Sequence, residues 1–141
     1  MSQTILLQAN TDLNELTNVL NWFEKLPHHS VPNPDWLRCK TAIAEVFTNA
    51  VRHAHRNMPT ETPISLEATL SIDMIEIKVF DYGSGFDLSE KLSNLDDVDT
   101  INALGGRGLD LISQMVDVFT YTKTSDGRNC MLIGKNYISV D

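Results

Sequence analysis

The sequence predicts a two-layer α/β sandwich, with a mixed, mainly antiparallel sheet and helices on one of its faces. Two observations carry this prediction. Apolar residues recur at helical spacing over 11–26 and over 34–55. Over 64–70 and 75–79 they instead alternate with polar residues, which is the pattern of half-buried strands.

The first half of the chain supplies a strand and two helices. Residues 4–9 form a short apolar strand, and Thr11 is a suitable N-cap for the helix that follows it. Asn33 and Pro34 are a suitable N-cap and first helical residue for the helix over 34–55.

The second half completes the plan after the two central strands. Segment 86–104 is polar and acidic with weak periodicity, so it is the best candidate for a mobile lid. A glycine-rich turn at 105–108 then opens a further helix, and strands over 119–123 and 130–135 form a closing hairpin.

Length and composition bound the class of protein. The chain has 141 residues, 42% of them hydrophobic, which suits a single domain over 1–141. Its net charge of −8 argues against nonspecific nucleic-acid binding, which needs a basic surface. The start of the chain has no signal-peptide pattern, and no apolar run is long enough to cross a membrane. We therefore expect a soluble cytoplasmic protein without a membrane partner.

Three polar residues interrupt the long helical segment at a spacing of four: Glu45, Asn49 and His53. This spacing places them along one face of a helix. In a purely structural interpretation, they form the solvated face of an amphipathic helix. In the functional interpretation, the Asn49 amide oxygen is a hard ligand suited to Mg²⁺, and Glu45 is a base one turn earlier. His53 supports the helix end or nearby phosphates.

Asp81 continues the parity of the buried residues in its strand, so its carboxylate is expected on the apolar face. Burial of a carboxylate is costly unless a partner is present. That partner is either the backbone of the following turn or a ligand donor such as the exocyclic amine of adenine. Gly83 and Gly85 follow at once and allow a flat base to approach the backbone.

The segment "GGRGLDLI" places Gly106 and Gly108 at the start of a helix, with Arg107 between them. Free N–H groups and the positive end of the helix dipole favour an anion there, and the arginine adds a cation. The pattern is that of a phosphate-binding turn, although many such sites are only turns.

In order, E-x-x-x-N-x-x-x-H, D-x-G-x-G and G-x-G resemble the three motifs of the GHKL ATPase superfamily. The length, the short lid and the closing hairpin more closely resemble the bacterial anti-sigma serine kinases, and the resemblance spans nearly the whole chain. One departure is Asp110, where many members of the superfamily have a third glycine.

The resemblance implies a Bergerat fold that binds ATP with Mg²⁺ and transfers the γ-phosphoryl group to a serine. By position, it implies that Glu45 is the catalytic base and that Asn49 holds the metal. It also implies that Asp81 binds the adenine amine. The glycines at 83 and 85 line the base pocket, and Gly106, Arg107 and Gly108 hold the triphosphate.

The resemblance also implies partners. These are a small anti-sigma-factor-antagonist substrate of the STAS type, a sigma factor that the chain sequesters, and a second copy of the chain in a homodimer. The alternative function is a nucleotide-dependent sequestering module without phosphotransfer. A histidine kinase is a further alternative, but the chain has no room for the helical hairpin that would carry an acceptor histidine.

Overall fold

The computed structural model describes residues 2–93 and 106–140. These residues contain five strands and four α-helices. The strands are β1 (Gln3–Ala9), β2 (Ile64–Leu70), β3 (Met74–Asp81), β4 (Val118–Lys123) and β5 (Asn129–Asn136). The helices are α1 (Leu16–Phe23), α2 (Asn33–Asn49), α3 (Leu88–Ser93) and α5 (Gly106–Met115). A 3-10 turn (Leu13–Glu15) precedes α1, and a π-helical turn (Ala50–Ala54) follows α2.

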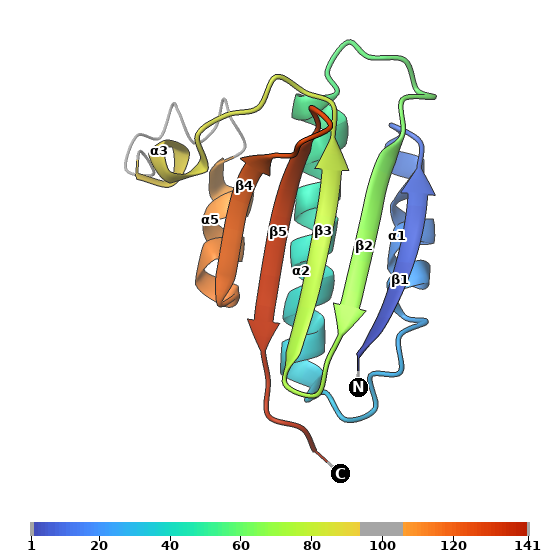
Figure 1. Cartoon of the computed structure of the whole chain (residues 1–141), viewed down its shortest axis with the longest axis vertical. Helices are drawn as coiled ribbons and strands as arrows, with labels where there is room; N and C mark the ends of the chain where they lie inside the picture. The colour runs from blue at the N-terminus through green and yellow to red at the C-terminus, as the bar shows by residue number, and fades with distance from the viewer. Residues whose placement is uncertain (1, 94–105, 141) are drawn as a thin grey trace.

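The strands form one sheet in the order β1-β2-β3-β5-β4, and all four neighbouring pairs are antiparallel. Figure 1 shows α1, α2 and α5 behind the same face of this sheet. The predicted two-layer α/β class is therefore confirmed.

Alternation along the central strands builds the core. Every second residue of β2 and β3 is buried, and the register pairs Leu66 with Val79 and Ala68 with Ile77. These side chains face α2, whose apolar residues recur every three or four positions. The buried residues of α2 are Trp36, Cys39, Ala42, Ile43, Val46 and Phe47.

A stack of three rings fixes the start of α2 against α1. The Trp36 ring lies 4.1 Å from that of Phe23 at an interplanar angle of 9°, and 3.9 Å from that of His28 at 7°. Glu24 accepts a hydrogen bond from Trp36 Nε1 at 3.2 Å and pairs with Lys40 at 2.7 Å. These contacts hold the start of α2, at the end of the helix opposite to Glu45 and Asn49.

Two of the expected helix caps are wrong by one residue. Asp12, not Thr11, accepts the capping hydrogen bond, from the N–H of Asn14 at 2.9 Å. Helix α2 begins at Asn33, after Pro32, and has no side-chain cap. Of the expected lid, residues 88–93 form α3, while 94–104 lie outside the described residues.

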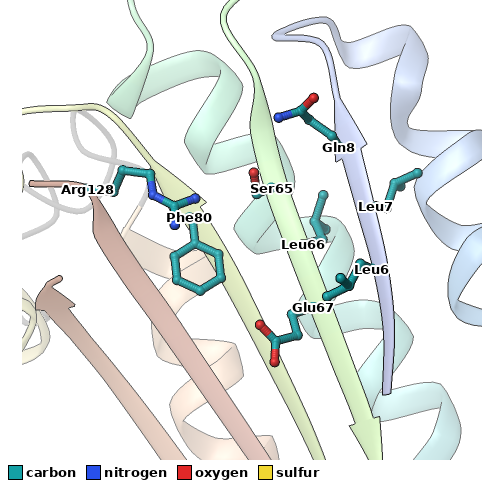
Figure 2. A pocket seen from close by; sticks show the side chains of 8 residues that line it. All are labelled: Leu6, Leu7, Gln8, Ser65, Leu66, Glu67, Phe80 and Arg128. Atoms are coloured by element: carbon teal, nitrogen blue, oxygen red, sulfur yellow. The ribbon is translucent and has the colours of Figure 1, made fainter. Parts of the chain in front are cut away.

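The opposite face of the sheet has no helix over it in the described part of the chain (Figure 1). A hollow of about 330 Å³ lies on this face, and Figure 2 shows the side chains that line it. Among them, the Arg128 guanidinium lies 4.5 Å from the centre of the Phe80 ring. Leu6 nearby is 71% exposed. Among the described residues no helix combines the length and apolar character needed to cross a membrane.

We expect Phe47→Ala to lower the free energy of unfolding by about 3–5 kcal/mol, because it leaves a cavity beneath the sheet. Phe47 is fully buried, whereas Leu37 on the same helix is 59% exposed. Leu37→Ala is the matched control and should change stability by less than about 0.5 kcal/mol. Equal losses in urea denaturation would contradict this assignment of the core.

Candidate functional site

Polar residues from three elements meet at one end of the molecule. Helix α2 and strand β3 finish there, and α5 begins there (Figure 1). The same end holds all the residues that the sequence singled out for chemistry.

The predicted polar line on α2 borders a small hollow of about 90 Å³. Glu45 and Asn49 lie in the C-terminal part of the helix, and His53 lies in the π-helical turn after it. The structure therefore brings these three residues together. The hollow is lined by Glu45, Thr48, Asn49, Arg52, His53 and Leu109.

The Glu45 carboxylate lies against the first turn of α5. A Cβ atom added to Gly108 would lie 3.2 Å from Glu45 Cδ and closer still to Oε2. Only a residue without a side chain allows this approach. The base candidate therefore lies beside the end of a helix that favours anions.

Asp81 is only 4% exposed, as its parity predicted, and its carboxylate has three hydrogen-bond donors. Oδ1 accepts from the Gly83 N–H at 2.8 Å and from Asn129 Nδ2 at 2.9 Å. Oδ2 accepts from the Tyr121 hydroxyl at 2.9 Å. Burial and the neighbouring Asp81 raise the pKa of Tyr121, so the phenol keeps its proton and remains a donor.

Sequence reasoning missed Tyr121 and Asn129. Asn129 pairs with Asp81 across β3 and β5, and its Nδ2 also donates to the Gly83 carbonyl at 2.8 Å. A polar residue that begins a strand of buried residues is a usable signal, but the identity of its partner depends on the register between strands. Nothing local marked Tyr121.

Both glycines after Asp81 are required by their surroundings. A Cβ atom on Gly83 would lie 2.7 Å from the carbonyl oxygen of Ala54. Gly85 has φ of +84°, which favours glycine, and a Cβ there would lie 3.1 Å from Asn129 Oδ1. Gly85 also borders a second hollow of about 330 Å³ together with Phe86.

Positive charge gathers around His53. Lys91 of α3 places its Nζ 4.3 Å from the centre of the Phe86 ring, and burial lowers the pKa of this lysine. Burial lowers the pKa of His53 too, and the charges of Lys91, Arg52 and Arg56 add to that effect. A surrounding of this sign favours a bound anion.

Gly106, Arg107 and Gly108 form the first turn of α5. The N–H groups of such a turn have no partner within the helix, and they lie at the positive end of its dipole. The side chain of Arg107 lies outside the described part of the structure.

No group of three or more histidine, cysteine, aspartate or glutamate residues that could hold a metal occurs in ranges 2–93 and 106–140. Mg²⁺ usually keeps several waters and takes only one or two protein ligands besides substrate phosphates. The Asn49 amide oxygen beside the hollow fits that kind of coordination.

His55, two residues beyond the predicted line, is 1% exposed and has a hydrogen-bond partner at each ring nitrogen. Burial lowers its pKa, and the Asp81 charge opposes this effect only in part. The ring is therefore neutral in the folded protein near pH 7.

We expect stability to fall as the pH drops below about 6.5, the ordinary pKa of histidine. His53 and His55 both have lowered pKa values, so the unfolded chain binds protons that the folded chain does not. Urea denaturation between pH 8 and pH 5 measures this slope, and His55→Gln should reduce it. A slope unchanged in that variant would contradict a buried neutral His55.

Comparison with known proteins agrees with this geometry. The sequence profile of the histidine kinase-like ATPase domain matches residues 9–135. The serine-protein kinase RsbW of Staphylococcus epidermidis is 36% identical over 91 residues, which are 61% of this chain and 57% of the relative. The protein of the same name from Listeria monocytogenes is 31% identical over 83 residues, which are 55% of this chain and 52% of the relative.

The chain thus matches little more than half the length of these curated relatives. The domain profile, in contrast, covers the sheet apart from nearly all of β1 and the last residue of β5. It also covers α2 with its polar line, the turn after β3 and the start of α5. This chain belongs to the family of histidine kinase-like ATPase domains.

Proposed function

We propose that this protein is an ATP-dependent protein-serine kinase that uses Mg²⁺. The observation that carries the proposal is the position of Glu45, whose carboxylate lies at the first turn of α5 and beside Asn49. A base next to an anion-binding helix end suits the transfer of a phosphoryl group to a hydroxyl, because the helix end can hold the phosphates and the base can accept the hydroxyl proton. The similarity to serine-protein kinases supports the same activity.

The residues present fit an adenine nucleotide. Asp81 Oδ1 accepts two hydrogen bonds, but Oδ2 accepts only the one from Tyr121. A carboxylate oxygen can accept two, so Oδ2 retains capacity for the exocyclic amine of adenine. Gly83 and Gly85 would line the base pocket.

The other roles follow from the chemistry of each group. ATP with Mg²⁺ would supply a transferable phosphoryl group whose charge the metal offsets. Asn49 would bind the metal through its amide oxygen, and the first turn of α5, with Arg107, would bind the phosphates. His53 would lie beside the phosphates, and Glu45 would accept the proton of the acceptor serine.

The proposed substrate is a small anti-sigma-factor antagonist of the STAS type, and a sigma factor is a proposed sequestered partner. We further propose a homodimer that works in the cytoplasm. The net charge of −8 suits partners with basic patches, because complementary charge favours their encounter.

We expect wild-type protein to transfer label from γ-labelled ATP and Mg²⁺ to a small protein of its source lysate, on serine. Glu45→Gln keeps the size of the side chain but removes the base, so transfer should fall by about 10²–10⁴-fold. Asn49→Ala should abolish the Mg²⁺-dependent transfer, because it removes the proposed metal ligand.

A melting experiment with ATP separates the possible outcomes. At a hundred times its dissociation constant, a ligand stabilises the folded state by about 2.7 kcal/mol. Stabilisation without transfer to any protein would favour the sequestering module. If ATP neither stabilised the protein nor was consumed, the proposed function would be wrong.

Gly108→Ala should reduce phosphotransfer by about 10²-fold and leave stability nearly unchanged. The added methyl group would displace the flexible Glu45 side chain, and small displacements of a catalytic group have effects of this size. Initial rates and thermal melts measure the two effects.

Leu111→Ala is the control on the same helix, because Leu111 is 50% exposed and does not line the hollow. It should leave the rate unchanged. A Gly108→Ala variant with the wild-type rate would show that the position of Glu45 does not depend on this glycine.

A further inference from the structure

His55 lies at the centre of a chain of hydrogen bonds that joins three parts of the sequence. Its Nε2 lies 2.8 Å from the backbone nitrogen of Tyr82, and its Nδ1 lies 2.8 Å from Thr11 Oγ1. The Thr11 hydroxyl in turn donates to the Thr62 carbonyl at 2.6 Å. The imidazole thus connects the end of the α2 segment with the turn after β3.

The partners of His55 determine its tautomer. The Tyr82 N–H can only donate, so Nε2 must be the acceptor and carries no proton. The Thr11 proton is directed to Thr62, so Thr11 Oγ1 accepts from Nδ1–H. Each of the three donors in this series of hydrogen bonds then has an acceptor. A protonated imidazole could not accept the hydrogen bond from the Tyr82 N–H, because both of its nitrogens carry protons.

The π-helical turn accounts for the direction of the imidazole. The His55 N–H bonds to the Ala50 carbonyl five residues earlier, at 2.8 Å. This turn contains one more residue than an α-helical turn. The residues after it are therefore rotated back about the helix axis by about 100°, compared with their directions in a regular α-helix. This rotation brings His55 approximately into line with the buried Phe47, whereas a regular helix would turn it away from the core.

A second contact lies next to this hydrogen bond. Gly83, the residue after Tyr82, packs so closely on Ala54 that a Cβ there would lie 2.7 Å from the Ala54 carbonyl oxygen. The turn after β3 is therefore held to the end of the α2 segment at two consecutive positions, one by packing and one by His55.

We propose that His55 is a positioning residue of the nucleotide site. Through the Tyr82 N–H it sets the turn that carries Asp81 and Gly83 relative to the helix that carries Asn49. This inference rests on the proposed function, because it assigns to His55 the spacing between the adenine-binding and the metal-binding parts of the site.

Two variants separate this role from a merely structural one. In His55→Gln the amide oxygen can reach the position of Nε2 and accept from Tyr82, whereas in His55→Asn the shorter amide can replace only Nδ1. Both variants lose one of the two ring contacts, so we expect similar losses in melting temperature. Binding of ATP should remain close to wild type in the Gln variant and weaken by about tenfold or more in the Asn variant.

Thr11→Val is a further control, because it removes the distant partner and leaves the Tyr82 contact in place. It should lower the melting temperature without weakening ATP binding. In phosphotransfer assays, His55→Asn should raise KM for ATP more than it lowers kcat, since Glu45 does not touch His55.

Equal ATP affinities in the Gln and Asn variants would overturn the inference, provided that wild type binds. Failure of wild type to bind ATP would instead refute the proposed function. Should the Asn variant not fold, nitrogen NMR of the wild-type imidazole gives an independent test. A proton on Nε2 at pH 7 would rule out the bond from Tyr82, and a proton on Nδ1 alone supports it.

Discussion

The buried carboxylate of Asp81 needs hydrogen-bond donors, and this need determines which residues meet at one end of the protein. A carboxylate removed from water is costly unless donors surround it, and here they come from the following turn, from β4 and from β5. Strand β5 lies next to β3 and β4 lies next to β5, so the donors from these two strands reach the carboxylate only when both strand pairs have formed. The side chain proposed to bind adenine is therefore also the one that depends on the pairing of the last hairpin.

Sequence periodicity predicted what depends on local pattern. Alternation in β2 and β3 gave the buried face and hence the burial of Asp81, and the spacing of four along α2 brought Glu45 and Asn49 to one hollow. Tyr121 could not be found in this way, because its partner lies 40 residues away on a strand that is not its neighbour. The prediction of Thr11 as the N-cap is wrong for a similar reason. Its hydroxyl is engaged with His55 and Thr62, so Asp12 caps the helix instead.

Glycines serve two different purposes in the site. Gly83 and Gly108 provide room, one for the Ala54 carbonyl and the other for the Glu45 carboxylate. Gly85 provides a backbone conformation, with φ of +84°. From the sequence alone, these glycines are explained by the approach of a ligand to the backbone. The structure adds that two of them are needed for contacts within the protein itself, before any ligand binds.

The π-helical turn also makes the direction of His55 independent of the directions of Glu45 and Asn49. Glu45 and Asn49 precede the turn, so their direction is set by the regular helix, whereas His55 follows it. Deletion of one residue within Ala50–Ala54 would restore an α-helix and rotate only what lies beyond. Insertions and deletions in this short stretch can thus change how the turn after β3 is held, while the part of α2 that carries Glu45 and Asn49 stays in place.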